Sequence, residues 1–333
     1  MNAPNPSPAA PRRRPLGISP PAEGEGGLFS QTWFPVCLSS DVGCSEVKGY
    51  DFLDGRIIVM RGENGVAQVM SAYCPHLGAD LSVGTVVNST VRCAFHHWQY
   101  DCEGRCVRTA VGDPPPPTAR LFRFPTAERF GIVYAFNGEK PLFELPGFKY
   151  PDDQLMWHTE RCSPDLPVDP WVICCNTPDV QHIRVLHHIN FDAADPGEHA
   201  RWTDCSMLYD FTGTHAGGER IEFEVGIFGT SIYYQSSRMH DRWFGFLSPM
   251  GLPRPQRTRA FFTVAVRKDE PNAEQFLQAM LELERRVLSE DLPVLESIHF
   301  RPGALSATDK TLARFLNYLT RYPRAHPAAE FIR

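Results

Sequence analysis

Two short cysteine–histidine pairs are the residues of this sequence most clearly suited to chemistry. One residue separates Cys74 from His76, a sixteen-residue gap follows, and two residues separate Cys93 from His96. Each pair offers one thiolate and one imidazole, which suits a tetrahedral zinc ion or a [2Fe–2S] cluster with both imidazoles on one iron. Spacing alone does not separate the two, although structural zinc sites usually space their paired ligands more widely than Cys74 and His76.

The two pairs fit a known signature. Their pattern resembles C-x-H-x(15–17)-C-x-x-H, which marks Rieske iron–sulfur domains. The resemblance implies a [2Fe–2S] cluster held by four ligands: Cys74, His76, Cys93 and His96. His97 is then expected to be a packing or interface residue, because the spacing already assigns His96.

The neighbours of the pairs bear on the reduction potential. Respiratory Rieske proteins resemble C-T-H-L-G-C and C-P-C-H-G-S, with two disulfide-forming cysteines and a serine where this chain has Ala79, Phe95 and Trp98. Without the disulfide, and with fewer hydrogen bonds to the sulfurs, we expect a potential toward the low end of roughly −150 to +300 mV. Oxygenases and ferredoxins have Rieske clusters of this type.

Composition limits the function classes. The 333 residues are 42% hydrophobic and 22% charged, which is typical of a soluble globular protein of about two domains. The net charge of −6 argues against a nucleic-acid partner, and no apolar run is long enough to span a membrane. The ten irregularly spaced cysteines and the need for reduced thiolates favour a cytoplasmic location, with Cys102 and Cys106 as free thiols.

Three regions follow from the pattern along the chain. Residues 1–28 are rich in Pro, Ala and Gly, and we expect a disordered tail there; no apolar segment of an export signal follows Arg12–Arg14. Short β-type runs broken by turns predict an all-β domain over 29–145, with the cysteine–histidine loops at one tip. Residues 146–333 would form a second domain.

A second group of polar residues lies in the segment 174–188. Asn176 is a plausible N-cap with Pro178 in the first turn, so a helix is predicted to begin here. Asp179 and His182 would share one face of it. His187 comes five residues after His182, so it needs a helix end or a bulge to face the same way. These residues alone fit a capped surface helix with satisfied histidines equally well.

This segment looks like the N-x-x-D-x-x-H-x(4)-H motif in the catalytic domain of Rieske non-haem iron oxygenases. The resemblance implies that His182 and His187, with a later aspartate, bind mononuclear iron(II) as a facial triad with open positions for dioxygen and substrate. Asp179 matches the family's bridging aspartate, and Asn176 matches the asparagine near the iron. His188 is an alternative to His187.

The third ligand is expected in a predicted helix within 272–301. Its apolar stripe consists of Phe276, Leu277, Met280, Leu281, Val287, Leu288, Val294, Leu295 and Ile298. Asp291 and Glu284 lie on this stripe and Glu290 borders it, so helical geometry leaves a choice among three carboxylates. The resemblance favours Asp291, because the oxygenases carry E-D-x(4)-E here, matched by Glu290, Asp291 and Glu296. Pro293 is expected to kink the helix.

The intervening residues 206–213, 220–237, 242–249 and 257–267 read as strands. The expected fold class is α+β, and the resemblance implies a helix-grip (Bet v 1/START-like) catalytic domain enclosing an apolar cavity. Candidates for its lining are Phe223, Ile227, Phe228, Tyr233, Phe244, Phe246 and Phe262. Each of them is individually explained as well or better by core packing.

The resemblance covers nearly everything after residue 30. It implies a terminal oxygenase (α) subunit, similar to the single-subunit vanillate and dicamba demethylases and aminopyrrolnitrin oxygenase. Such a subunit receives electrons from a reductase or ferredoxin and uses dioxygen to hydroxylate, demethylate, desaturate or N-oxygenate an apolar or aromatic small molecule, more as a monooxygenase than a dioxygenase. The family's head-to-tail homotrimer would place Asp179 between one subunit's cluster and its neighbour's iron. The alternative is a Rieske electron-transfer protein or redox sensor.

Overall fold

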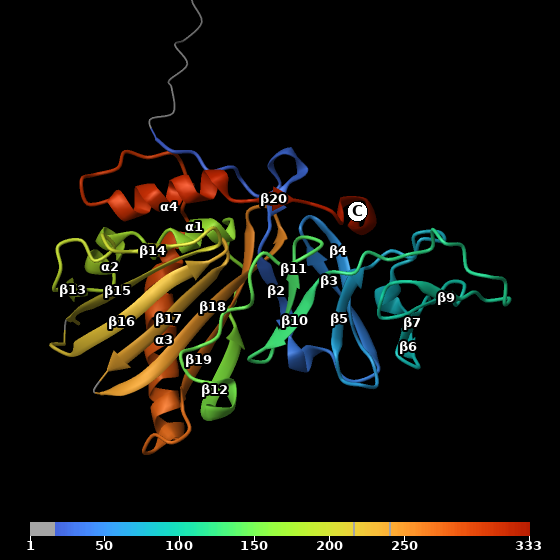
Figure 1. The fold of residues 1–333 in the computed structure, drawn as a ribbon, viewed down its shortest axis with the longest axis horizontal. Helices are drawn as coiled ribbons and strands as arrows, with labels where there is room; N and C mark the ends of the chain where they lie inside the picture. The colour runs from blue at the N-terminus through green and yellow to red at the C-terminus, as the bar shows by residue number, and fades with distance from the viewer. Residues whose placement is uncertain (1–16, 216, 240) are drawn as a thin grey trace, which may run out of the picture.

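The structure is a computed structural model that describes residues 17–215, 217–239 and 241–333. Small sheets, drawn in blue and green in Figure 1, lie beside one large curved sheet that is backed by a long helix. Strands with a few helices make up both halves of the described chain, which confirms the predicted α+β class.

Three small antiparallel sheets form the N-terminal part. Their strand orders are β10-β11-β2, β3-β4-β5 and β6-β7-β8-β9. Aromatic and β-branched residues fill these strands, as expected for half-buried pleated surfaces. The bounds are β2 (Trp33–Leu38), β3 (Glu46–Phe52), β4 (Gly55–Arg61), β5 (Ala67–Ser71), β6 (Thr85–Val87), β7 (Thr90–Arg92), β8 (Gln99–Tyr100), β9 (Cys106–Arg108), β10 (Thr126–Arg129) and β11 (Ile132–Phe136). Cys102 and Cys106 are free thiols, as predicted.

The large sheet has eight antiparallel strands. Its order is β12-β19-β18-β17-β16-β15-β13, and β14 also pairs with β15. The bounds are β12 (Leu155–Arg161), β13 (Asn190–Phe191), β14 (Arg201–Trp202), β15 (Ser206–Thr214), β16 (Arg220–Phe228), β17 (Ile232–Met239), β18 (Arg242–Arg254) and β19 (Arg257–Arg267). The segment 220–237, predicted as one strand, is a hairpin, because Gly229 adopts a φ of +61° and turns the chain.

Helices cover the large sheet. They are α1 (Pro170–Cys174), α2 (Val180–Val185), α3 (Ala273–Leu295) and α4 (Lys310–Arg321). The last helix, α5 (Ala329–Ile332), contacts β4 of the N-terminal part instead. Short 3-10 turns lie at Glu25–Gly27, Ser39–Asp41, Leu81–Val83 and Asp152–Gln154. Within the described residues, no helix is long and apolar enough to cross a membrane.

The helix α3 packs its apolar face against β12 and β19. Its buried residues are Ala273, Phe276, Leu277, Met280, Leu281, Glu284 and Leu295. This three-and-four spacing is the predicted helical stripe. Val294, which was predicted to lie on the buried apolar stripe, is 49% exposed, so the prediction is wrong for this residue. Pro293 lies in the last turn of α3, so the hydrogen bond that its missing N–H removes lies at the end of the helix and not in its middle.

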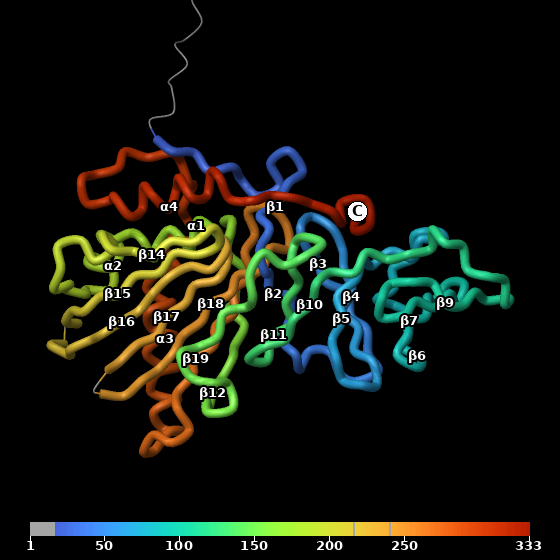
Figure 2. The backbone as a smooth tube through the Cα atoms, in the orientation of Figure 1, coloured from blue at the N-terminus to red at the C-terminus, as the bar shows by residue number. Residues whose placement is uncertain are grey.

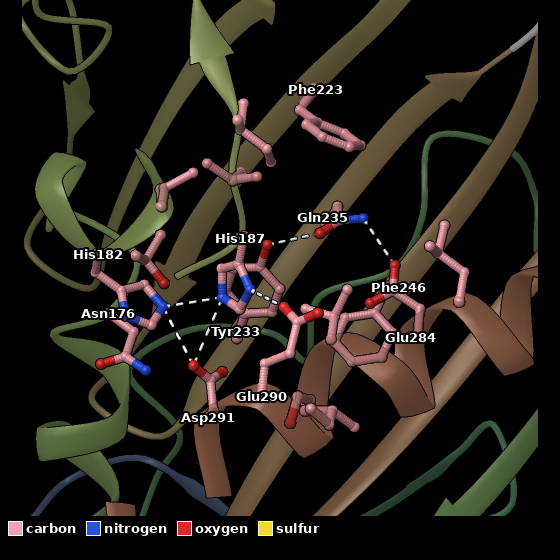
Figure 3. Close-up of a pocket in the computed structure, with 18 of the residues that line it drawn as sticks. Asn176, His182, His187, Phe223, Tyr233, Gln235, Phe246, Glu284, Glu290 and Asp291 are labelled. Carbon is pink, nitrogen blue, oxygen red and sulfur yellow. Dashed lines mark hydrogen bonds and ion pairs between the residues drawn. The ribbon is translucent and has the colours of Figure 1, made fainter. Parts of the chain in front are cut away.

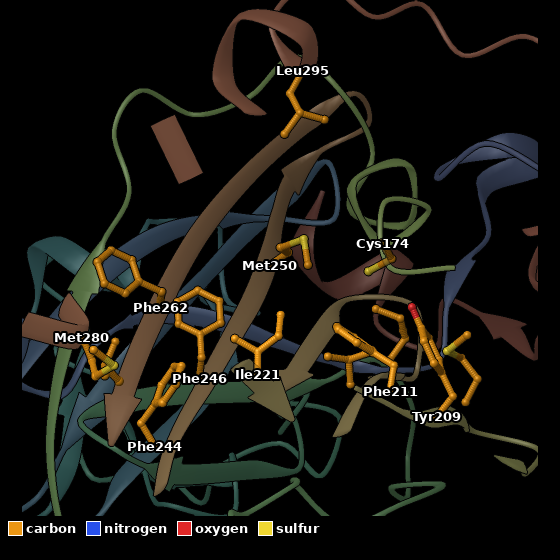
Figure 4. Close-up of a cluster of buried hydrophobic side chains, with 14 of the residues drawn as sticks. Cys174, Tyr209, Phe211, Ile221, Phe244, Phe246, Met250, Phe262, Met280 and Leu295 are labelled. Atoms are coloured by element: carbon orange, nitrogen blue, oxygen red, sulfur yellow. The ribbon is translucent and has the colours of Figure 1, made fainter. Parts of the chain in front are cut away.

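The main core lies between α3 and the large sheet. Figure 4 shows Phe244, Phe246 and Phe262 from β18 and β19 beside Met280 from α3. Phe244 and Phe246 are two residues apart and therefore project from the same face of β18. Burying each such side chain contributes roughly 1.5–3 kcal/mol. The core therefore fixes α3 on the sheet, and with it every polar residue that α3 carries.

The C-terminus returns to the N-terminal part, so the predicted boundary at 145/146 does not divide the chain into two closed units. The strand β20 (Arg324–Ala325) pairs with β1 (Phe29–Ser30). Figure 2 shows the red C-terminal tube beside the blue strands. Ile332, with no exposed area, packs into the same cluster as Phe52 and Ile57. Residues after 323 therefore belong to the core of the N-terminal part.

The predicted disordered tail spanned residues 1–28. Residues 1–16 lie outside the described residues, but 17–28 pack against the protein body, so the prediction is wrong for them. Glu23 is 3% exposed, and its carboxylate accepts hydrogen bonds from the Ser30 N–H (2.9 Å) and hydroxyl (2.6 Å). Its own N–H donates to Asp169 (2.9 Å). Amino-acid composition indicates only the local tendency to disorder, whereas here a contact with Asp169, which is distant in the sequence, holds the segment in place.

We predict that Phe315→Ala lowers stability by about 3–5 kcal/mol, because the Phe315 ring on α4 has no exposed area and its loss leaves a cavity. Asn317→Ala, an exposed change on the same helix, is the matched control and should alter stability by about 0.5 kcal/mol or less. Thermal unfolding of both variants is the measurement. Equal melting temperatures for Phe315→Ala and Asn317→Ala would contradict the packing of α4 onto the core.

Candidate cluster loops and metal centre

The two cysteine–histidine loops lie next to each other at the tip of the N-terminal part. The Cys74 and Cys93 side chains are each 2% exposed and contact one another. His76 is exposed and His96 is half-buried, with their ring centres 4.6 Å apart. Paired buried thiols beside paired outer imidazoles fit a cluster in which one iron takes sulfur ligands and the other takes nitrogen.

Matching backbone turns shape the two loops. The Gly78 N–H donates to the Cys74 carbonyl (2.8 Å), and the His97 N–H donates to the Cys93 carbonyl (3.1 Å). The fourth residue after each cysteine is left-handed, with a φ of +77° at Gly78 and +56° at His97. This conformation costs a non-glycine residue about 1–2 kcal/mol. His97 therefore closes the second loop, a backbone role that its spacing did not reveal.

Aromatic residues surround the loops. The Trp98 ring stacks on His76, with ring centres 4.4 Å apart and an interplanar angle of 9°. The Tyr100 hydroxyl lies 3.0 Å from the Cys74 sulfur and can donate to its thiolate. Sequence reasoning missed this bond, because it compared the position of Trp98 with the serine of respiratory proteins. Tyr100 lies opposite Val91 across the strand pair β7–β8, and only that pairing reveals its direction.

The helix α2 begins three residues later than predicted. Its N-cap is Asp179, whose carboxylate accepts a hydrogen bond from the His182 N–H (3.0 Å), and not Asn176. An Asn176 cap would make Thr177 the first helical residue, yet the residue before Pro178 is disfavoured in helical conformation. The buried Tyr209 hydroxyl donates to the Thr177 carbonyl (2.6 Å) and anchors this turn.

The end of α2 brings His187 round to face His182, as the spacing required. The helix ends at Val185, and His188 follows His187 with a φ of +53°. The Nε2 atoms of His182 and His187 lie 3.0 Å apart. The second histidine of the pair, His188, is not among the three side chains that converge.

Asp291 completes the group from α3. Its Oδ1 lies 3.3 Å from His182 Nε2 and 3.5 Å from His187 Nε2 (Figure 3). Two donors that each bind one metal ion at about 2.1 Å are themselves roughly 3.0–3.5 Å apart when they occupy neighbouring positions. Asp291 Oδ1 is buried without a hydrogen-bond donor. Two nitrogens and one oxygen at these distances fit a metal ion bound on one face.

Burial sets the protonation of the group. Desolvation, followed by the neighbouring His187, lowers the pKa of His182 to about 4, so its Nε2 is free of a proton near neutral pH. Desolvation raises the pKa of Asp291 to about 6, with His187 opposing this shift. The Nδ1 of His187 lies 2.9 Å from a Glu290 carboxylate oxygen. This bond holds the proton on Nδ1 and leaves Nε2 as a lone-pair donor.

The other two candidate carboxylates lie in different surroundings. Glu290 contacts the far nitrogen of His187, and Glu284 is hydrogen-bonded to Gln235 Nε2 (3.1 Å). Neither joins His182, His187 and Asp291 in the convergent group. Glu296 is exposed beyond the helix end.

A cavity of about 170 Å³ opens beside the convergent group. Asn176, His182, His187 and Asp291 line one side of it, and most of the remaining lining is apolar. Of the seven predicted lining residues, Phe223, Tyr233, Phe244 and Phe246 line the cavity. The other three, Ile227, Phe228 and Phe262, pack in hydrophobic clusters instead. Phe228 points to the opposite face of the sheet, because strand alternation separates it from Ile227.

Comparisons with known proteins agree with both halves of this geometry. Residues 32–122 match the model of the Rieske [2Fe-2S] domain. Cholesterol 7-desaturase of Bombyx mori is 29% identical over 191 residues, which are 56% of this chain and 40% of that protein. Aminopyrrolnitrin oxygenase PrnD of Pseudomonas fluorescens is 41% identical over 97 residues, 27% of each chain. Residues 32–122 therefore form a Rieske [2Fe-2S] domain, and the relatives that the chain resembles include a desaturase and an oxygenase.

The similarity of the fold to solved structures covers most of the chain. The crystal structure of dicamba monooxygenase bound to dicamba superposes with a TM-score of 0.67 and 19% identity, covering 88% of this chain and 97% of that one. The match to the Bombyx mori relative spans less than half of that protein. The Rieske domain that the chain matches is a [2Fe–2S] domain.

We predict that Tyr100→Phe lowers the reduction potential of the cluster, because the hydroxyl 3.0 Å from Cys74 Sγ stabilises the more negative reduced state. A redox titration followed by visible absorbance measures this shift. Tyr134→Phe, a buried change on β11, is the control and should leave the potential unchanged. An unchanged potential in Tyr100→Phe would show that the hydroxyl does not donate to the cluster.

Proposed function

We propose that this chain is a terminal oxygenase that receives electrons through a Rieske cluster and activates dioxygen at mononuclear iron(II) to oxidise an apolar or aromatic small molecule. One observation carries the proposal: His182 Nε2, His187 Nε2 and Asp291 Oδ1 converge within 4.8 Å at the wall of an apolar cavity. Oxidation by one oxygen atom, as in a monooxygenase, is the expected outcome.

The chain offers a ligand set for each cofactor. The cluster ligands are Cys74, His76, Cys93 and His96, and the iron ligands are His182, His187 and Asp291. When bound by two histidines and one carboxylate, iron(II) supplies dioxygen activation at its remaining open positions.

The residues around the iron site have supporting tasks. Glu290 orients the His187 ring through Nδ1 and so keeps Nε2 directed at Asp291. Asn176 lines the same side of the cavity (Figure 3). The apolar side chains Phe223, Phe244 and Phe246 exclude water and hold the apolar part of the substrate.

Electron transfer between subunits is part of the proposal. The cluster loops and α2 lie at opposite ends of the chain in Figure 1, which favours transfer to a neighbouring copy in a homotrimer. The half-buried Asp179 caps α2 beside His182, where it can bridge to a cluster histidine of a neighbour. A reductase or ferredoxin supplies the electrons, and the free cysteines are in keeping with the reducing cytoplasm.

Iron and acid-labile sulfide per chain test this function on anaerobically purified protein. We expect roughly three irons to two sulfides in the wild type. His182→Ala should lose one iron and keep the cluster, because it removes one of three converging donors. His188→Ala is the matched control and should retain all three irons.

Two irons to two sulfides in the wild type and in both variants would refute the oxygenase. The chain would then be an electron-transfer module, and the buried convergence of His182, His187 and Asp291 would need another cause.

A second prediction concerns Asp179. Asp179→Asn should keep the helix cap, the cluster and the iron, yet slow oxidation of the chemically reduced cluster by dioxygen about tenfold or more, since the bridging charge is lost. Rapid mixing followed by cluster absorbance measures the rate. Asp179→Ala, which also loses the cap, should cost about 1 kcal/mol of stability. A wild-type rate in Asp179→Asn would limit this residue to capping α2.

A further inference from the structure

A short chain of polar side chains crosses the largely apolar wall of the cavity. The Tyr233 hydroxyl donates to Gln235 Oε1 (2.7 Å), and Gln235 Nε2 donates to Glu284 Oε1 (3.1 Å). Figure 3 shows Gln235 and Glu284 away from the group formed by His182, His187 and Asp291. The first two residues belong to β17 and the third to α3, so the triad joins the two walls of the cavity.

The carboxyl group at the end of this triad is buried with little compensation. Glu284 is 5% exposed and Gln235 is 8% exposed. A carboxylate has about four lone-pair sites, and among the described residues only Gln235 donates a hydrogen bond to the Glu284 side chain. Desolvation raises the pKa of Glu284 to about 8, so the group is largely a neutral acid near neutral pH. Such a group has hydrogen-bonding capacity left for a ligand in the cavity.

The Asp, Glu, Lys and Arg residues that line the cavity are all acidic. Among the described residues that line it, none is Lys or Arg, whereas three are acidic. Two of the three acids are engaged: Glu290 contacts His187, and Asp291 faces His182 and His187. Glu284 is therefore the acid that remains for a substrate, and the described lining offers no Lys or Arg side chain to pair with a substrate carboxylate at that end of the cavity.

We propose that Glu284 is a specificity-determining residue that binds the basic nitrogen of the substrate, so that this cavity selects apolar amines and rejects apolar carboxylates. This inference rests on the proposed function, because selecting an amine decides which molecule is oxidised only if the chain is an oxygenase. Gln235 is a positioning residue, because its amide hydrogen bond holds the Glu284 carboxyl in place and Tyr233 holds the amide.

The proton balance of binding is simple. An amine that is already protonated near neutral pH binds while the Glu284 carboxyl releases its proton to solvent. The site then contains a carboxylate–ammonium pair, with the Gln235 N–H as the further hydrogen bond that a buried ion pair requires. No bond other than this O–H bond breaks, and no other reactant is needed.

The helix sets the position of the nitrogen relative to the oxidised atom. Glu284 and Asp291 are seven residues apart on α3, which is about two turns and roughly 10 Å along the helix axis on one face. The cavity of about 170 Å³ is comparable with the roughly 150 Å³ that suffices for benzene. A substrate with one ring and a short aminoalkyl arm therefore places its amine at Glu284 and its other end toward the iron ligands.

Calorimetric titration of the anaerobic holoenzyme with three matched probes tests the inference. The probes are 2-phenylethylamine, propylbenzene and 3-phenylpropanoate, which share a ring and differ in the charge of the arm. We expect the amine to bind at least about tenfold more tightly than propylbenzene, and the carboxylate to bind most weakly.

Glu284→Gln keeps the size of the side chain and its hydrogen bond to Gln235. This variant should lose about tenfold or more in amine affinity and change propylbenzene affinity by about twofold or less. Glu282→Gln, an exposed change on the same helix, should alter neither affinity. Unchanged cluster absorbance and iron content would show that each variant is folded.

An amine that binds no more tightly than propylbenzene, or does not bind, overturns the proposal. It is also overturned if Glu284→Gln binds the amine as the wild type does, which would leave the triad as a strut between β17 and α3. Both results come from binding and not from turnover. If either is found in protein that holds three irons per chain, amine selection is refuted and the proposed oxygenase function is not. A missing mononuclear iron would instead refute the oxygenase function, and the calorimetric titration would still test the amine selectivity of the cavity.

Discussion

A buried carboxylate oxygen without a hydrogen-bond donor is the constraint on which the rest of this structure depends. Asp291 Oδ1 faces two imidazole nitrogens, and burial lowers the pKa of His182, so that ring carries no compensating charge near neutral pH. An uncompensated buried carboxylate costs several kcal/mol. A divalent cation shared by the three donors removes that cost. The three donors keep this spacing because α2 ends between His182 and His187, and because α3, which carries Asp291, is packed on the large sheet.

The same physical device prepares the imidazoles at both proposed cofactor sites. At each site a neighbour orients one of the two rings proposed to bind a metal: the Trp98 ring stacks on His76, and Glu290 contacts Nδ1 of His187. A fixed ring needs little reorganisation when its metal changes oxidation state, and for His187 the hydrogen bond to Glu290 also sets the tautomer in advance. In the cluster loops the thiols of Cys74 and Cys93 are buried, while the imidazoles of His76 and His96 lie nearer the protein surface.

Local spacing made most of the fold predictable, whereas the choice of ligand residues came from the resemblance of short motifs to those of Rieske oxygenases. The cysteine–histidine loops, the stripe of α3 and the strands of the large sheet are all encoded within short windows, and the required break after His182 followed from helix geometry alone. What sequence reasoning missed depends on distant partners. Ser30 and Asp169 order the segment around Glu23, Ile332 fills the N-terminal core, and strand pairing aims Tyr100 at Cys74. The capping error arose because Pro178 restricts its predecessor more strongly than Asn176 favours a cap.

Anomalous scattering at the iron edge from crystals of the anaerobic holoprotein tests the central claim most directly, because it locates each iron. The account predicts two separate iron positions in every chain. One is a pair of irons between the thiols of Cys74 and Cys93 and the imidazoles of His76 and His96, and the other is a single iron among His182, His187 and Asp291. Iron in the cluster loops alone, with the three converging donors metal-free in fully loaded protein, would contradict it.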